Sequence, residues 1–331
     1  MKKYCFHLIL IFFCSCDQLL LEEDPENSLV QNFEIFWREF DRHYAFLELK
    51  ELDWDSVYQI SRPKVESFTS EAALFNLLEE IVLSLEDGHV NLYSNTGTVS
   101  YDFTAGFPAN SPEHVINYLE NISQPNNKII HADLKNTNLG YFRVGSFGGD
   151  RSSFEVIDEI IKRFEQKEGI IIDVRSNSGG SDTNGGIIAS RFADRKRLHR
   201  RFKYRNGPGA TDFTTWFDDH VEPDGLHFSK PVVVLTNRGC FSSTEDFILA
   251  MRILPHVQVV GGITGGGSGN PIIRELPNGW LFRLSTWVMA TPDFETFEEI
   301  GLAPDVSVTI SEEDAANQKD TILEEAIALI D

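Results

Sequence analysis

The chain has 331 residues, of which 41% are apolar and 24% are charged, and it carries a formal net charge of -22. This composition is that of an ordinary globular protein and excludes wholesale disorder. The strong negative charge repels phosphate groups, so we expect neither nucleic-acid binding nor attraction to an anionic membrane surface. The length suffices for one sizeable core with a small satellite domain.

The first residues have the pattern of an export signal. Lys2 and Lys3 precede an apolar stretch that ends at Phe13. Such a segment predicts a secretory signal peptide over residues 1–15, and it is shorter than a membrane-spanning helix. Plain secretion and an uncleaved anchor are the alternatives to lipidation at the cysteine that follows.

That cysteine, Cys16, stands after the small residue Ser15. The pattern resembles a bacterial lipobox and implies lipidation at Cys16, although Phe13-Cys14 departs from the smaller aliphatic residues of that motif. Residues 16–28 hold five acidic residues and a proline, which predicts a solvated tether. We therefore expect a protein of the bacterial cell envelope, periplasmic or surface-exposed, that touches the membrane through its lipid anchor alone.

Apolar residues at three- and four-residue intervals predict helices in the next part of the chain. One helix is expected from Leu29 to Tyr44, a shorter one near 54–60, and a third from about Glu71 to Leu85. The third ends at Asp87-Gly88, where glycine can adopt the left-handed cap conformation. We expect a small helical domain over 29–91, with His89 just beyond its last helix.

Residues 92–137 are rich in loop-forming residues, and we interpret them as a connector of unassigned fold. From Leu139 onward, strand and helix patterns alternate. This order predicts right-handed crossovers and a mostly parallel sheet, hence an α/β core over 138–310. Strands are expected at 140–147, 170–174, 231–235 and 257–260, helices at 152–164 (after a Ser152-x-x-Glu155 capping box), 186–192 and 244–254, a hairpin around 277–279, and a C-terminal helix within 311–331.

Ligands collect at the carboxyl ends of strands in open parallel sheets, and two loops are expected there. The loop over 236–243 contains Ser242 at a strand-to-helix junction, where free helix N–H groups stabilise an adjacent anion. Local spacing alone favours the simpler interpretation that this serine caps the helix. In the other loop, Gly179-Gly180 suits an oxyanion hole, but a pair of turn glycines has the same appearance.

His89 differs from the other eight histidines because it follows an acidic, glycine-broken helix end, from which its side chain can project. The run Gly265–Gly269 lacks the lysine or spacing of a phosphate-binding loop, so we interpret it as a flexible wall of a substrate groove. The histidines and carboxylates show no metal-ligand spacing, and we expect neither a metal nor a cofactor.

Five motifs in this order resemble the C-terminal processing (tail-specific) proteases and the tricorn core peptidases. The resemblance rests on these segments: Leu85-Glu86-Asp87-Gly88-His89, Leu139-Gly140-Tyr141-Phe142, Asp173 to Gly180, Phe241-Ser242-Ser243-Thr244-Glu245, and Gly301 to Asp305. It implies a core of spiral βα units of the crotonase and Clp type behind the helical domain. Because the family nucleophile stands three residues before a glutamate, the resemblance makes Ser242 the nucleophile.

Two departures place the chain nearer to the tricorn-like branch. The processing proteases use a serine–lysine dyad, but the matching position falls near Gly267, and no lysine occurs between Ser242 and Asp305. The processing proteases also carry a PDZ domain between the His89 and Tyr141 motifs, where this chain has about fifty residues, too few for that domain.

In the tricorn-like branch a histidine from the N-terminal segment is the base, which implies His89. The same resemblance implies a supporting carboxylate at Glu298, with Glu299 or Asp87 as alternatives. It also implies an oxyanion hole from the N–H groups of Ser243 and of Gly179 or Gly180. We expect a serine endopeptidase or carboxy-terminal-type peptidase acting on peptides or unfolded proteins. The rival interpretations are a catalytically silent member that binds peptides or hydrophobic ligands, and a crotonase-like acyl-CoA enzyme.

Overall fold

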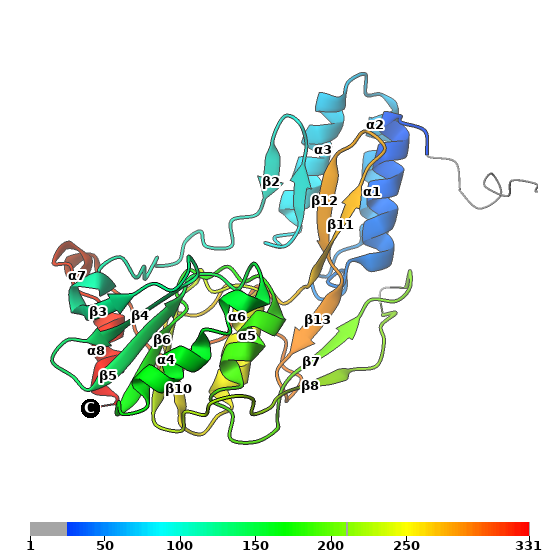
Figure 1. Cartoon of the computed structure of the whole chain (residues 1–331). Coiled ribbons are helices and arrows are strands. Elements are labelled where there is room, and N and C mark those ends of the chain that lie inside the picture. Colours follow the sequence, from blue (N-terminus) through cyan, green and yellow to red (C-terminus); the bar gives the residue numbers. More distant parts are fainter. Residues whose placement is uncertain (1–24, 210, 331) are drawn as a thin grey trace, which may run out of the picture.

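The structure, a computed structural model, describes residues 25–209 and 211–330. The expected signal peptide, the lipidation site Cys16 and most of the tether lie outside the described residues. Figure 1 shows three N-terminal helices at one end of the molecule and a large sheet with its own helices at the other. Within the described part of the chain, no helix is long and apolar enough to cross a bilayer.

The N-terminal helices are α1 (Leu29–His43), α2 (Trp54–Glu66) and α3 (Glu71–Ser84), which confirms the helices expected from periodicity. Both α1 and α3 begin after a serine, Ser28 and Ser70, whose hydroxyl accepts a backbone N–H of the first turn. Both of these serines have the extended backbone that is usual for a helix cap.

A small antiparallel sheet completes this part of the molecule, with strand order β11-β12-β1-β2. Phe36 and Phe40 of α1 pack on Phe282, with ring centroids 5.2 and 5.9 Å apart. The helical part is therefore closed by a hairpin from much later in the chain, and the expected turn at 277–279 is confirmed. The strands are β1 (Asn91–Tyr93), β2 (Thr98–Ser100), β11 (Pro271–Glu275) and β12 (Leu281–Ser285).

The central sheet has seven strands in the order β14-β10-β9-β6-β5-β4-β3. The five strands from β14 to β5 run parallel, while β4 and β3 are antiparallel to their neighbours, so the expected mostly parallel sheet is confirmed. Its strands are β3 (Leu119–Ser123), β4 (Ile129–Leu134), β5 (Leu139–Val144), β6 (Gly169–Asp173), β9 (Val232–Thr236), β10 (Val257–Gly261) and β14 (Val306–Ser307).

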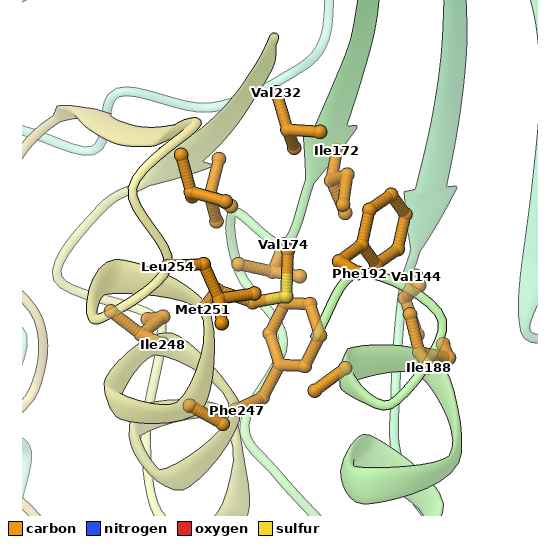
Figure 2. Packing of buried hydrophobic residues seen from close by; sticks show 14 of the residues in the cluster. Val144, Ile172, Val174, Ile188, Phe192, Val232, Phe247, Ile248, Met251 and Leu254 are labelled. Atoms are coloured by element: carbon orange, nitrogen blue, oxygen red, sulfur yellow. The ribbon is translucent and has the colours of Figure 1, made fainter. Parts of the chain in front are cut away.

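Every residue of β6 and β9 is buried, because helices cover both faces of this sheet. Ile172 and Val232 point into one core, where Figure 2 shows them with Ile188 of α5 and Phe247 of α6. Ile171 points the other way, into a core with α8. The helices are α4 (Ile157–Phe164), α5 (Asp182–Ala189), α6 (Ser243–Arg252), α7 (Glu312–Ala316) and α8 (Thr321–Ala328).

A third, antiparallel sheet lies beside α5 and α6 and has the order β13-β7-β8. Its strands are β7 (Arg197–Tyr204), β8 (Phe217–Val221) and β13 (Trp287–Ala290). Residues 195–205 hold seven lysines and arginines, four of which lie on β7, and two of these, Arg200 and Arg201, pair with aspartates on β8. The basic run is therefore neutralised within the fold.

Two segments differ from the sequence expectation. Residues 92–137, expected as a connector, include a 3-10 turn, η2 (Val115–Tyr118), and the strands β3 and β4 of the central sheet. In β3 only Leu119 is buried, so this edge strand has almost no apolar periodicity. The helix expected to open at the Ser152 capping box begins instead at Ile157, after the 3-10 turn η3 (Arg151–Ser153).

Candidate active site

Ser242 immediately precedes α6 in a backbone conformation unlike that of an ordinary helix cap. Its φ is 59° and its ψ is -128°, whereas the capping serines Ser28 and Ser70 have φ of -122° and -149°. A non-glycine residue held at positive φ costs about 1–3 kcal/mol and persists where the surroundings impose it. The half-buried Ser242 is therefore held in place by its neighbours.

Glu245 is the group that holds the Ser242 backbone. Its carboxylate accepts the N–H groups of Ser242 at 3.1 Å, Gly266 at 2.8 Å and Gly267 at 2.7 Å, and also the Thr264 hydroxyl. Burial raises the pKa of Glu245 to about 7, although these four donors oppose the rise. One buried carboxyl group thus ties the Ser242 turn to the glycine run.

The loop after β6 lies directly against Ser242. A Cβ atom at Gly179 would be 2.9 Å from the Ser242 Cβ, so only glycine permits this approach. The Gly179 N–H donates to Asn177 Oδ1 at 2.9 Å. The N–H groups of Gly180 and Ser243, in contrast, have no acceptor among the described residues. Of the three N–H groups expected to hold an oxyanion, those of Gly180 and Ser243 are free to donate, whereas that of Gly179 already donates to Asn177.

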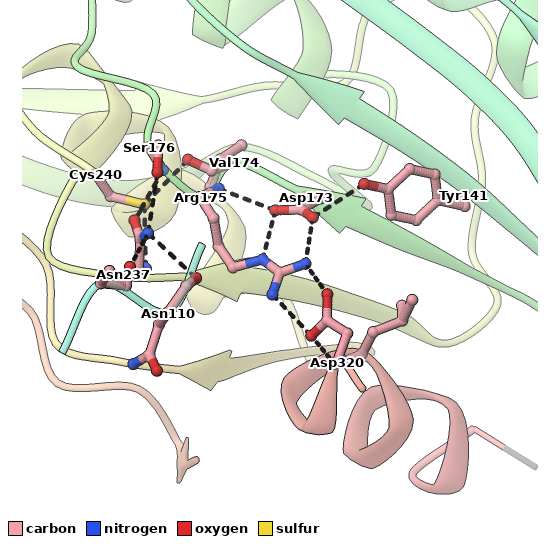
Figure 3. Close-up of polar contacts among 11 residues, drawn as sticks. Asn110, Tyr141, Asp173, Val174, Arg175, Ser176, Asn237, Cys240 and Asp320 are labelled. Carbon is pink, nitrogen blue, oxygen red and sulfur yellow. Dashed lines mark hydrogen bonds and ion pairs between the residues drawn. The ribbon is translucent and has the colours of Figure 1, made fainter. Parts of the chain in front are cut away.

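A buried ion cluster fixes the start of the same loop (Figure 3). The Arg175 guanidinium bonds to Asp173 on β6 and to Asp320, the residue that precedes α8. Tyr141 donates its hydroxyl to Asp173 at 2.9 Å. Burial lowers the pKa of Arg175, but the two carboxylates raise it more, so its pKa stays above the ordinary value. The cluster links the C-terminal helix to the loop that carries Gly180.

His89 lies just past α3, with its ring 4.5 Å from the ring of Phe241, the residue before Ser242. The His89 side chain is buried, and its Nδ1 has no hydrogen-bond partner within the described chain. Burial lowers the pKa of His89 to about 4, although the Asp87 carboxylate opposes the shift. The fold thus brings this N-terminal histidine to the Ser242 turn, but no hydrogen bond joins the two side chains among the described residues.

The expected carboxylates occupy different environments. Glu298 is buried, and its Oε2 accepts the Ser268 N–H and hydroxyl at 2.6 and 2.7 Å. Burial, together with the negative charge of Asp87, raises the pKa of Glu298 well above its usual range. Glu299, in contrast, is exposed and pairs with Lys50. Glu298 is therefore the buried member of the pair.

Asp87 holds the backbone of His89. Its Oδ1 accepts the His89 N–H at 2.7 Å, while Oδ2 accepts the hydroxyls of Tyr44 at 3.1 Å and Ser285 at 2.9 Å. The three donors come from the segment after α3, the segment after α1 and the end of β12. Asp87 therefore ties His89, two positions further along the chain, to two other segments of the fold.

The glycine run contradicts the expectation of a flexible wall. Glu245 binds the N–H groups of Gly266 and Gly267, as described above, and residues 264–269 are buried. A Cβ atom at Gly267 would lie 2.1 Å from the Phe241 ring, and Gly266 has φ of 77°. The ring of Phe241 is held in turn by Phe103, stacked at 4.1 Å. No room is left for a lysine side chain at either position.

Ser242 opens into a pocket of about 80 Å³. Gly180, Ser243 and Gly267 line it, together with Trp287 and Met289 of β13. The two β13 residues were missed by sequence reasoning, since nothing in their local pattern distinguishes them from ordinary core residues of a strand. The two residues with free N–H groups thus line the same pocket as the serine, an arrangement that can stabilise an oxyanion formed at that serine.

Residues 138–308 match peptidase family S41, and residues 25–82 match the C1 domain of tricorn protease. The chain belongs to peptidase family S41. This serine-type peptidase family includes carboxy-terminal processing proteases, so the resemblance seen in the motifs is confirmed.

Individual proteins similar to this chain agree with the family assignment. The carboxy-terminal processing protease CtpA of Bacillus subtilis is 24% identical over 183 residues, which cover 55% of this chain and 37% of that protein. The chain thus spans little more than a third of the length of this curated relative. A crystal structure from Parabacteroides merdae, assigned provisionally as a peptidase, is 36% identical with a TM-score of 0.84 over 92% of this chain and 97% of that chain. Tricorn protease, 16% identical, shares the fold with a TM-score of 0.55, covering 91% of this chain and 36% of its own.

Proposed function

We propose that this S41 member hydrolyses peptide bonds, as an endopeptidase or a carboxy-terminal-type peptidase, through an acyl-enzyme on Ser242. The environment of Ser242 is the observation that carries the proposal. The serine is held at positive φ before α6, and the same pocket is lined by Gly180 and Ser243, whose N–H groups have no acceptor within the described chain. Preorganised donors around a nucleophile are the feature that most accelerates acyl transfer.

In the proposed reaction, His89 accepts the Ser242 proton while Ser242 Oγ attacks the peptide carbonyl carbon. The carbonyl oxygen becomes an oxyanion and accepts the N–H groups of Ser243 and Gly180, each of which contributes about 10²–10³ in rate. The tetrahedral intermediate collapses, the C–N bond breaks, and His89 gives its proton to the leaving amine. Water, deprotonated by His89, then hydrolyses the ester and restores the Ser242 hydroxyl.

Burial keeps the His89 imidazole neutral at neutral pH, which is the form that accepts a proton, while a pKa of about 4 makes it a weaker base than an ordinary histidine. Its Nδ1 has no competing partner within the described residues. The proposal requires that the imidazole approach Ser242 more closely when a substrate binds. Catalytic hydrogen bonds commonly shorten in this way in the enzyme–substrate complex.

We assign positioning roles to the two buried carboxyl groups. Asp87 fixes the backbone of His89, and Glu298, bound to Ser268, supports the wall of the pocket. Burial and the charge of Asp87 raise the pKa of Glu298 and so favour its neutral form, which suits a hydrogen-bonding role. Glu299 has no part in the proposal.

The second candidate is a catalytically silent member that binds peptides or hydrophobic ligands in the same pocket. One observation favours it: His89 and Ser242 share no hydrogen bond in the described chain. An active-site fluorophosphonate probe separates the two candidates. Covalent labelling that disappears in Ser242→Ala and slows in His89→Ala supports the peptidase. Labelling that survives Ser242→Ala contradicts the assignment of the nucleophile.

We also propose that the protein is exported and anchored in the bacterial cell envelope through a lipid on Cys16. The lipobox-like Ser15-Cys16 pattern supports this, and so does the acidic stretch that follows. Membrane fractionation tests it, since Cys16→Ser should release the protein into the soluble fraction. Retention of the variant in the membrane would instead indicate an uncleaved N-terminal segment.

A further inference from the structure

An aromatic strip crosses the three-stranded sheet that lies beside α5 and α6 (Figure 1). The strip consists of Trp287 on β13, Tyr204 and Phe202 on β7, and Phe217 on β8. In the strand register Trp287 lies opposite Tyr204, and Phe202 lies opposite Phe217. Side chains that are two residues apart, or directly opposite across paired strands, share one face of a sheet. The four rings therefore lie on the same face.

Ring contacts join the strip into one continuous surface. The centroid of the Phe202 ring lies 4.7 Å from that of Trp287 and 5.4 Å from that of Phe217, on which it stacks. The Tyr204 ring lies 5.4 Å from Trp287 and 6.1 Å from Phe217. Aromatic rings at such separations attract one another, so the strip is a preformed surface rather than four separate side chains.

The same sheet face forms a wall of the Ser242 pocket. Trp287 and Met289, two residues apart on β13, both line that pocket. The Trp287 indole N–H donates to the carbonyl oxygen of Ser268, which ties the inner end of the strip to the glycine run. A peptide whose carbonyl group lies at Ser242 therefore meets the strip at Trp287.

The outer part of the strip is not covered by the described residues. Trp287 is 8% exposed, Phe202 and Tyr204 are half-buried, and Phe217 is 44% exposed. Contiguous exposed apolar surface commonly marks a binding site. Because the inner end of this surface lines the pocket of the nucleophile, the molecule best placed to cover it is the peptide on which Ser242 acts.

The width of the sheet sets which residue of a peptide can reach the outer end. Paired strands lie about 4.8 Å apart, so β8 lies about 10 Å from β13, two strands away. An extended peptide advances about 3.3 Å per residue. In a peptide that runs along the strip, a side chain about three residues from the bond at Ser242 therefore reaches the Phe217 ring.

We propose that the aromatic strip binds a large apolar or aromatic side chain of the peptide substrate, about two to four residues from the bond that Ser242 attacks. This inference rests on the proposed peptidase function and names its substrate class. Large apolar side chains are mostly buried in folded proteins. The strip therefore selects extended or unfolded segments over folded surfaces.

Binding to the Ser242→Ala protein tests the preference without requiring cleavage. Fluorescence anisotropy compares short fluorescein-labelled peptides of alanine, serine and glutamine whose central residue is either phenylalanine or serine. We expect the phenylalanine peptide to bind about tenfold more tightly than the serine peptide. Equal binding of the two peptides overturns the inference.

A substitution at the outer end of the strip locates the binding surface. Phe217→Ser should weaken binding of the phenylalanine peptide by about threefold to tenfold and leave binding of the serine peptide unchanged. Since Phe217 is exposed, this substitution should leave the fold intact. Phe294→Ser is the matched control, because Phe294 is 51% exposed and packs on Arg201, which points to the opposite face of β7. An equal loss in the two variants overturns the inference.

Two further measurements separate this inference from the proposed activity and from self-association. Selective binding without cleavage of any peptide supports the strip and overturns the proposed hydrolysis alone. Where peptides are cleaved, mass spectrometry should find the phenylalanine about two to four residues from the broken bond, and random distances overturn the inference. Sedimentation velocity tests the other occupant, a second copy of this chain. A dimer that Phe217→Ser dissociates, together with no preference among peptides, would assign the strip to self-association and overturn the inference.

Discussion

The ring of Phe241 fills the space that a side chain at Gly267 would need, because a Cβ atom at position 267 would lie 2.1 Å from that ring. The Phe241 ring also packs against the His89 ring, with centroids 4.5 Å apart, and stacks on the Phe103 ring at 4.1 Å. The region that would hold a lysine in the serine–lysine members is thus packed with aromatic side chains. The proposed mechanism therefore takes its base from another segment, and His89 packs against this cluster.

The first prediction concerns that packing. Gly267→Ala should lower the free energy of unfolding by about 2 kcal/mol or more, since the added methyl group overlaps the Phe241 ring. Chemical denaturation measures the loss. Gly97→Ala is the control, because a Cβ atom at Gly97 meets nothing within 4 Å. A Gly267→Ala protein as stable as the Gly97→Ala protein would show that the ring moves aside freely.

The second prediction concerns pH. If His89 is the base, fluorophosphonate labelling should proceed at a constant rate from about pH 8 to pH 5 and fall as the pH approaches 4, where burial places the pKa of His89. Folding stability has the matching sign. Because the unfolded chain binds the proton more readily, the contribution of His89 to stability is lost as the pH falls from about 6.5 towards 4. Half-loss of labelling near pH 6.5 would indicate an ordinary exposed histidine as the base.

The parts of the site that could be predicted from sequence are those with local patterns. Ser242 stands at a strand-to-helix junction, and Gly179 and Gly180 follow a continuous apolar strand, so their place at one edge of a parallel sheet follows from strand order. The sequence could not predict that the Gly179 N–H donates a hydrogen bond within the fold while the Gly180 N–H does not. That difference depends on the rotamer of Asn177, which accepts the Gly179 N–H.

The parts that could not be predicted are the contacts between distant segments. Asp87 and Ser285 are 198 positions apart, yet they share a buried hydrogen bond. Trp287 and Met289 have the pattern of any buried strand and reach Ser242 only because β13 pairs with β7 beside α6. The edge strand β3 shows the same limit for the fold, because its place depends on pairing with β4 rather than on its own apolar residues.

The third prediction asks whether Glu298 acts as a charge. Because burial and Asp87 raise its pKa well above the usual range, Glu298→Gln should keep stability within about 1 kcal/mol and labelling within about threefold. Glu298→Ala should cost about 1–3 kcal/mol, since the N–H and hydroxyl of Ser268 lose their acceptor. Thermal denaturation and labelling rates compare the two. A glutamine variant as slow in labelling as the alanine variant would mean that a negative charge is required.

The fourth prediction concerns the cluster behind the oxyanion loop. Asp320→Asn leaves the buried Arg175 with one carboxylate in place of two, and breaking such a buried pair typically costs about 3–5 kcal/mol. Asparagine can still accept the Leu323 N–H that Asp320 accepts at the start of α8, so the loss measures the ion pair rather than the helix cap. Asp194→Asn, which removes the exposed partner of Arg197, is the control and should leave the unfolding midpoint unchanged.

If Arg175 also fixes the loop of Gly180, the Asp320→Asn protein should be labelled more slowly even at temperatures where it is fully folded. Labelling at the parental rate under those conditions would restrict the cluster to a role in stability.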